Sequence, residues 1–359
     1  MEKRPTYLSI QALRGVASLL VVLFHLRIVE GKFGSGETLL PSWLNFGYAG
    51  VDLFFVISGF VMATVAKGRC GSFSEAGRFL RKRAWRVLPL YWLYTTVVVV
   101  LMALVPSMVN TSYQNQSALA SYLLWPQSTL PLLSVGWTLV FEFYFYLMTA
   151  MAIALLPQRF FLHFLYVWAA VVAIGWTMFE TTSPVLSTAF SPMAWEFIAG
   201  ALVAMYWRRI PAAWGAPLLW AGAVAFIAAM LLLDRLDLLL DGGMYRVAIF
   251  GVASSLVVAG AVVLEASRRA SIPAWLMSVG DSSYSLYLSH VFVISASGRL
   301  WQLSSFNTAS WQHAGFIALT VLACVIVGQA SNCWLERPLL SLEKVGRSAT
   351  TLSPPRLDS

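Results

Sequence analysis

The sequence predicts an all-α integral membrane protein, a single bundle of about ten transmembrane helices with both termini in the cytoplasm. Its composition, its apolar runs and its basic residues predict this class. Of 359 residues, 59% are hydrophobic and 11% charged, and the mean hydropathy is +0.73. Soluble domains carry roughly 25% charged residues. The composition therefore excludes a soluble enzyme, a coiled coil, a disordered chain and a nucleic-acid-binding domain, and makes membrane lipids the main solvent.

Ten apolar runs have the length that crosses a bilayer, which is roughly 17–25 residues for a helix. The first run contains Arg14 and is followed by no small-residue cleavage site, so we interpret it as a span and not as a secretory signal. The predicted spans are about Ser9–Leu26, Tyr48–Val65, Val87–Val105, Val135–Leu156, Phe161–Phe179, Pro192–Trp207, Pro217–Leu233, Tyr245–Leu264, Tyr284–Leu300 and Trp311–Leu335.

Lys and Arg residues are distributed unequally between the two sides of these spans. With the N-terminus inside, 18 of the 24 lie in inside segments, 5 lie in outside segments or, like Arg246 and Arg299, at the outer end of a span, and Arg14 lies within a span. Cytoplasmic segments of membrane proteins carry the excess of Lys and Arg. The asymmetry therefore predicts that both termini are cytoplasmic.

The segments between and after the spans indicate no second domain. We expect residues 1–340 to form one transmembrane domain. The longest outside segment is Pro106–Ser134, in which Ala118–Trp125 has the pattern of a short interfacial helix. Residues 341–359 are rich in Ser, Thr and Pro toward their end, and we expect them to form a disordered cytoplasmic tail.

Two ionisable residues of the first span share one helix face. Arg14 and His25 are eleven residues apart, which is close to three whole turns at ~3.6 residues per turn and about 16 Å along the axis. Ionisable residues within a span are costly and therefore indicate function. The alternative is that Arg14 extends to the inner interface while His25 caps the outer end of the helix.

Three carboxylates lie at similar positions in spans that begin on the outer side. Asp52 is about four residues into its span, Glu142 about seven and Glu196 about four. We therefore expect all three in the outer half of the membrane, near His25. One His with carboxylates is typical of a general base and its orienting partner. The alternative, a carboxylate paired at the interface with Arg or Trp, fits Glu196 best and Glu142 least.

The strongest basic cluster, Arg81 to Arg86, precedes the third span. By itself it is typical of a topology signal that contacts anionic lipid. The alternative is a site for a phosphate-rich cytosolic ligand, because Arg binds phosphate through two N–H groups. We interpret His290, in the ninth span, as a residue of the bundle core. The sequence contains no metal-ligand pattern, no GxSxG motif and no P-loop, so no metal is expected.

Specific motifs are spread over residues 9–340. They are Arg14-x10-His25, GVDLFFVISGF at 50–60, FLRKRAWRVLP at 79–89, WTLVFEFYFY at 137–146, YSLYLSH at 284–290 and the tripeptide ERP at 336–338. Together they resemble the acyltransferase 3 family of bacterial membrane acyltransferases, and within it the exopolysaccharide-production type.

The resemblance implies a reaction and a location. An acyl group, usually acetyl, would pass from cytosolic acyl-CoA to a hydroxyl of an extracytoplasmic or lipid-linked sugar, in the modification of exopolysaccharide or another surface glycan. The protein would lie in the bacterial cytoplasmic (inner) membrane. Its partners would be acyl-CoA, the glycan acceptor and membrane lipids, with no nucleic acid.

The resemblance also implies roles for individual residues. His25 would be catalytic, either by taking the proton of the acceptor hydroxyl or by carrying the acyl group itself, and both routes stay open. Glu142 or Asp52 would orient its imidazole. The residues expected to bind the donor are Arg14, Arg83, Arg86 and Trp137.

A transporter is the alternative function. Intramembrane carboxylates with His also form proton relays, so the same residues could serve a proton-coupled carrier of sugars or lipid-linked oligosaccharides. Interrupted helices in matched halves of the chain would favour a carrier, and the sequence shows none that pair. The motifs therefore favour the enzyme.

Overall fold

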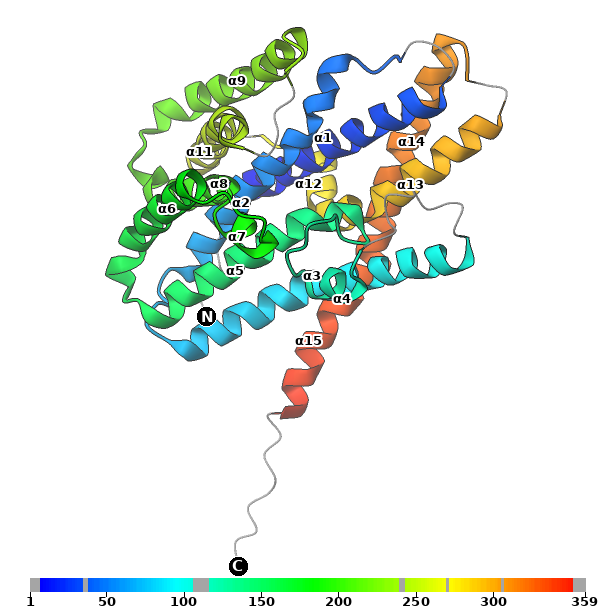
Figure 1. Ribbon diagram of the computed structural model, residues 1–359. Coiled ribbons are helices and arrows are strands. Elements are labelled where there is room, and N and C mark those ends of the chain that lie inside the picture. Colours follow the sequence, from blue (N-terminus) through cyan, green and yellow to red (C-terminus); the bar gives the residue numbers. More distant parts are fainter. Residues whose placement is uncertain are drawn as a thin grey trace, which may run out of the picture.

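The protein is a bundle of α-helices (Figure 1). The computed structural model describes residues 7–34, 38–105, 116–238, 243–268, 271–304 and 307–350, and this part of the chain contains no strand. The all-α prediction is therefore confirmed. The helices are α1 (Leu8–Phe33), α2 (Gly50–Ala66), α3 (Phe73–Leu104), α4 (Ala118–Leu123), α5 (Trp137–Leu155), α6 (Phe161–Met178), α7 (Pro184–Ala189), α8 (Met193–Tyr206), α9 (Gly215–Arg235), α10 (Met244–Arg246), α11 (Val252–Ala266), α12 (Ala274–Asp281), α13 (Ser283–Leu303), α14 (Ser310–Ser331) and α15 (Arg337–Thr350).

Nine helical stretches within the described residues are long and apolar enough to cross a bilayer. They correspond to nine of the ten predicted spans. The remaining span is α13, a helix of 21 residues that contains several Ser residues, a His and an Arg. It packs inside the bundle between α1 and α14. The structure thus agrees with a bundle of about ten helices.

Glycine allows α2 and α8 to cross at very short range. A Cβ atom on Gly59 would lie 1.9 Å from the carbonyl oxygen of Phe197, and one on Gly200 would lie 1.9 Å from that of Val56. Small residues at such crossings let the backbones of transmembrane helices approach closely. The crossing holds α2 in the middle of the bundle, where it also contacts α1, α5 and α11.

The segment that joins α3 to α5 turns back into the bundle. The Tyr91 hydroxyl donates to the carbonyl of Ser121 at 2.8 Å, and Trp92 Nε1 donates to the carbonyl of Tyr122 at 2.8 Å. Trp92 precedes the end of α3 at Leu104 by twelve residues, which is about 18 Å along the axis. The predicted short helix is present as α4, but it packs against the middle of α3. A Cβ on Gly136, the residue before α5, would lie 2.9 Å from the ring of Tyr91, so α5 also begins beside the middle of α3.

Two π-helical turns carry charged side chains into the interior. They span Val247–Gly251 and Asn332–Glu336. The first directly follows Arg246, and the second ends at Glu336; both of these side chains are buried. Turns of this kind are rare and frequently mark functional sites.

The last described helix, α15, extends away from the bundle to Thr350 (Figure 1). Near its start, Trp85 Nε1 of α3 donates to the carbonyl of Leu339 at 3.0 Å. Of the segment expected to be a disordered tail, residues 341–350 are helical, and residues 351–359 lie outside the described part of the chain.

Candidate functional site

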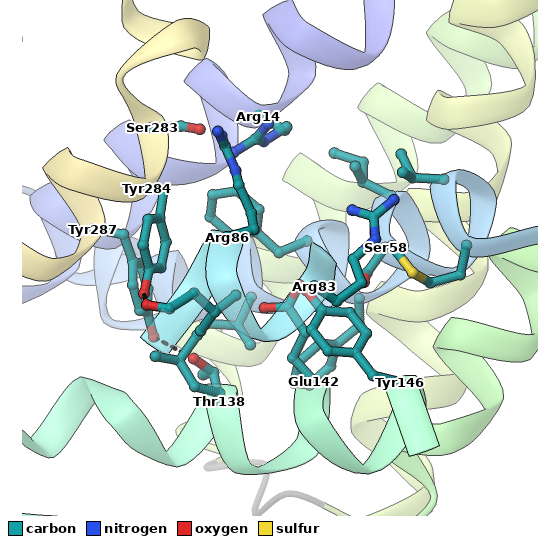
Figure 2. Close-up of a pocket in the computed structure, with 18 residues that line it drawn as sticks. Arg14, Ser58, Arg83, Arg86, Thr138, Glu142, Tyr146, Ser283, Tyr284 and Tyr287 are labelled. Carbon is teal, nitrogen blue, oxygen red and sulfur yellow. Dashed lines mark hydrogen bonds between the residues drawn. The ribbon is translucent and has the colours of Figure 1, made fainter. Parts of the chain in front are cut away.

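A cavity of about 130 Å³ lies among α1, α2, α3, α5 and α13 (Figure 2). We call it the arginine cavity. Apolar side chains, mostly from α2, form one wall. Its polar lining residues are Arg14, Ser58, Arg83, Arg86, Thr138, Glu142, Tyr146, Ser283, Tyr284 and Tyr287.

Positive charge exceeds negative charge at this cavity. Arg14 of α1 and Arg86 of α3 end close to each other, with Arg83 one turn before Arg86 (Figure 2). Two carboxylates oppose these three guanidinium groups. Glu142 lines the cavity, and Glu336 Oε1 lies 3.1 Å from Arg86 Nη2. Because burial strengthens electrostatic interactions, the excess charge makes the cavity attractive to an anion.

The ion pair of Arg86 is supported from two helices. Glu336 is 1% exposed, and its Oε2 accepts hydrogen bonds from Ser285 Oγ at 2.6 Å and from Asn332 Nδ2 at 2.9 Å. The side chain of Arg86 is 36% exposed. Glu336 therefore holds one end of Arg86 in place while the rest of the guanidinium faces the cavity.

The structure places Glu142 in the arginine cavity, which Arg14 also lines and His25 does not. Glu142 accepts a hydrogen bond from the hydroxyl of Tyr146 one turn later, and both side chains lie across the cavity from Arg14 (Figure 2). Glu142 was expected near His25 because its position was counted from the start of an apolar run, whereas α5 begins beside the middle of α3. No hydrogen bond joins His25 to Glu142 or to Asp52 in the described part of the chain.

Asp52 belongs to a buried ion pair. Arg246 donates from Nε to Oδ1 at 2.9 Å and from Nη2 to Oδ2 at 2.6 Å, and the two side chains are 1% and 8% exposed for Asp52 and Arg246, respectively. The guanidinium also lies 4.5 Å from the ring centroid of Tyr48. This two-point contact satisfies the charge of Asp52. The expected pairing of Asp52 with His25 is therefore replaced by a pairing with Arg246, which sequence reasoning assigned to an outside segment.

Two other residues from the sequence analysis lie outside the arginine cavity. The ring of Trp137 packs edge-to-face on Phe141, with centroids 6.0 Å apart, and Trp137 is not among the cavity-lining residues. Glu196 is 1% exposed and lies against the π-helical turn, where a Cβ on Gly251 would be 2.9 Å from its Cγ. Glu196 is thus buried, in contrast to the interfacial alternative.

His25 meets a second histidine, His290 of α13. The His290 Nε2 and His25 Nδ1 atoms are 3.3 Å apart, and the ring centroids are 4.9 Å apart with the rings inclined at 62°. His290 is fully buried, and His25 is half-buried. In each residue Nδ1 also faces the carbonyl oxygen one turn earlier, that of Val21 at 2.9 Å and that of Leu286 at 3.2 Å.

These contacts assign the tautomers of the histidine pair. A carbonyl oxygen only accepts, so each Nδ1 carries a hydrogen. Nε2 of neutral His290 is then an acceptor, and the Nδ1–H of His25 is shared between Val21 and His290. This arrangement leaves Nε2 of His25 without a hydrogen, so its lone pair can accept a proton.

Tyr287 lies between the arginine cavity and the histidine pair. It lines the cavity, and its ring centroid is 5.8 Å from that of His290, one turn further along α13. Its hydroxyl donates to the carbonyl of Val135 at 3.0 Å and lies 2.9 Å from Thr138 Oγ1. Sequence reasoning did not connect these residues. The signal was available, because Tyr284, Tyr287 and His290 recur every three residues, a spacing that places neighbours on one side of a helix.

Comparisons with known proteins agree with the motifs. An acyltransferase domain family, acyltransferase 3, matches residues 7–329. Exopolysaccharide production protein ExoZ of Rhizobium meliloti (strain 1021) is 32% identical over 321 residues, which cover 86% of this chain and 94% of the relative. Acyltransferase MdmB of Streptomyces mycarofaciens is 25% identical over an alignment of 398 positions, gaps included, which covers 98% of this chain and 96% of the relative. No solved structure matches. The chain belongs to the acyltransferase 3 family.

Proposed function

We propose that this member of the acyltransferase 3 family transfers an acyl group, first of all acetyl, from cytosolic acyl-CoA to a sugar hydroxyl on the outer side of the bacterial inner membrane. The observation that carries the proposal is the succession of a positively charged cavity, Tyr287 and the pair His25–His290 along the bundle. Of the two functions that the sequence left open, family membership favours the enzyme over the transporter.

The donor binds in the arginine cavity. Arg14, Arg83 and Arg86 supply positive charge, and the apolar wall formed by α2 suits a slender, mostly uncharged chain such as pantetheine. Glu142, with Tyr146 hydrogen-bonded to it, balances part of this positive charge from across the cavity. Glu142 therefore acts on the donor, whereas the sequence suggested that it orients His25.

His25 is the general base. Its Nε2 takes the proton of the acceptor hydroxyl while the hydroxyl oxygen forms a bond to the thioester carbonyl carbon. The carbon–sulfur bond then breaks, and the thiolate leaves with the proton that the imidazolium returns. The carbonyl of Val21 keeps the hydrogen of His25 on Nδ1, which is the tautomer that this step needs, and His290, which accepts from the same N–H, orients the ring.

The acceptor is a sugar of an exopolysaccharide or another surface glycan. One relative is named for exopolysaccharide production, and it aligns with most of this chain. A transfer that begins with cytosolic acyl-CoA and ends on a surface sugar requires the N-terminal end of α1, near Arg14, to face the cytoplasm. The excess of Lys and Arg on that side supports this orientation.

Surface glycans of a strain with and without the gene test the function directly. We expect mass spectrometry to show acetyl groups that are lost on deletion and restored by complementation. In parallel, the purified protein in nanodiscs should consume acetyl-CoA only when glycan from the deletion strain is supplied. Identical glycans in both strains, together with no consumption of acetyl-CoA, would overturn the proposal.

The orientation has its own test. Single cysteines placed at Arg78 and at Ser117 should react with a membrane-impermeant maleimide from opposite sides of the membrane. Ser117 lies in the predicted outside segment Pro106–Ser134, of which Asn115 lies outside the described residues. Labelling of both positions from the same side would contradict the proposed topology.

A further inference from the structure

A second cavity, of about 420 Å³, opens where α1 begins and α2 ends. We call it the entrance cavity. Arg14 and Val61 line both cavities, so the two are adjacent along the bundle. The residues that line the entrance cavity are Tyr7, Ile10, Gln11, Arg14, Phe60, Val61, Thr64, Val65, Lys67 and Arg69.

The two cavities differ in size. Pockets that hold small molecules and cofactors commonly measure roughly 300–1,000 Å³. The entrance cavity lies in this range, and the arginine cavity, at about 130 Å³, is much smaller. The arginine cavity can therefore admit a narrow arm of a ligand, whereas a bulky head group fits only the entrance cavity.

The two cavities also differ in charge balance. Among the described residues, three cations line the entrance cavity and no acidic side chain does. Lys67 is exposed. Arg69 has one long contact, 3.8 Å from its Nη1 to Glu75, and the other oxygen of Glu75 lies 2.6 Å from Arg78. Most of the hydrogen-bonding capacity of Arg69 thus remains available to a phosphate.

An aromatic ring completes the wall of the entrance cavity. Tyr7 packs edge-to-face on Phe60, with centroids 5.1 Å apart, and on Trp207 at 6.1 Å. These two contacts hold the Tyr7 ring in a defined position beside the cations. A fixed ring next to positive charge is a common arrangement for a base that carries phosphates.

We propose that the entrance cavity binds the phosphorylated nucleotide end of the acyl-CoA donor. In this arrangement Lys67 and Arg69 contact its phosphates, and the pantetheine arm passes Arg14 into the arginine cavity. The inference rests on the proposed function, because it names the part of the donor that each cavity takes. It differs from the expectation of the sequence, which gave the phosphates to Arg83 and Arg86. Those residues contact instead the arm that carries the acyl group.

Donors of graded length test the assignment. We expect Lys67→Ala with Arg69→Ala to raise the KM for acetyl-CoA about 10- to 100-fold. The reason is that the loss of one hydrogen bond to a charged group weakens binding by about tenfold. With acetyl-3′-dephospho-CoA the rise should be smaller. With acetylpantetheine, which has no nucleotide, the wild type and the double variant should have equal KM values within about twofold.

The control is Arg208→Ala with Arg209→Ala. These exposed cations lie just after α8 and line neither cavity. They match the double variant in lost charge, so a general electrostatic effect would raise the KM in both. An equal rise in the control, an equal rise with acetylpantetheine, or no rise with acetyl-CoA would each overturn the inference. If the wild type used no acyl-CoA at all, the proposed function itself would fail.

A binding measurement is independent of turnover and separates two sources of phosphate. Adenosine 3′,5′-bisphosphate should bind the wild type in phosphatidylcholine nanodiscs and lose most of its affinity in the Lys67→Ala, Arg69→Ala variant. The cations could instead serve an anionic lipid headgroup. Stabilisation by phosphatidylglycerol that needs Lys67 and Arg69, with no binding of the bisphosphate, would show that source and overturn the inference.

Discussion

The charged residues inside this bundle form two kinds of site. In one, Asp52 and Arg246 meet through two hydrogen bonds, and both side chains are almost completely buried. In the other, Arg14, Arg83 and Arg86 border a cavity that contains too few carboxylates to balance them. All of these charges lie in costly positions. The comparison teaches that an intramembrane charge indicates binding or catalysis when it faces a cavity. When a buried ion-pair partner covers the charge, it indicates a structural role.

The largest effect on activity should come from His25, whose Nε2 makes no hydrogen bond within the described part of the chain. We expect His25→Ala to lower acyl transfer by about 10²–10⁴-fold, the range for loss of a general base. The measurement is transfer of radiolabelled acetyl from acetyl-CoA to isolated glycan by purified protein in nanodiscs. His163→Ala is the matched control, because His163 lies exposed on α6, where its ring packs edge-to-face on that of Phe160.

Two results would change this picture. Near wild-type transfer by His25→Ala would remove the catalytic assignment. An acetylated form of the wild type that accumulates without acceptor, and is absent in His25→Ala, would replace the general base with a covalent route.

The largest effect on stability should come from the buried ion pair of Asp52 and Arg246. Asp52→Asn leaves the Arg246 charge buried without its partner, which costs about 3–5 kcal/mol in the free energy of unfolding. Glu142→Gln borders a cavity and should cost at most about 1 kcal/mol. Denaturant unfolding in detergent compares them. Replacing both partners, Asp52→Leu with Arg246→Met, should recover most of the loss, and equal costs for Asp52→Asn and Glu142→Gln would contradict the distinction between the two sites.

Local periodicity and hydropathy were sufficient to predict the class of the fold. Within the described residues, runs of apolar residues marked the nine helices that are long and apolar enough to span a membrane, and also α13, whose Ser and His residues lower its hydropathy. The spacing of Arg14 and His25 placed both on one face of α1, since helix geometry relates residues of the same element. Such rules act within one helix, and for this reason they succeeded there.

Relations between helices were predicted less well. Asp52 and Arg246 are 194 residues apart in the sequence, so no local pattern joins them. Glu142 was expected near His25 because depth was counted from the first apolar residue, and this count fails when a segment such as α4 packs against the middle of α3. His290 was interpreted as a core residue. It is indeed buried, but which ring it meets depends on the packing of α13 against α1.

A smaller effect on activity should come from the residues of the arginine cavity. We expect Arg83→Ala with Arg86→Ala to raise the KM for acetyl-CoA about 10- to 100-fold, because two charged hydrogen-bond donors are lost. Turnover at saturating donor should fall less. The same rise should appear with acetylpantetheine, which distinguishes these residues from Lys67 and Arg69. An unchanged KM in folded protein would leave Arg83 and Arg86 as determinants of topology.

The smallest effect should come from His290, which shares features of both sites because it is fully buried and yet touches the proposed base. His290→Leu removes one acceptor of the His25 Nδ1–H, but the carbonyl of Val21 at 2.9 Å still holds that hydrogen. The reactive tautomer of His25 is therefore kept, and only the orientation of the ring loosens. We expect kcat to fall about tenfold or less, the value of one net hydrogen bond, with KM for acetyl-CoA unchanged.

His290→Gln should restore part of the loss, because its side-chain carbonyl can accept from the same N–H. A loss in His290→Leu as large as that in His25→Ala would contradict the positioning role, since it would mean that His290 itself moves a proton in the reaction.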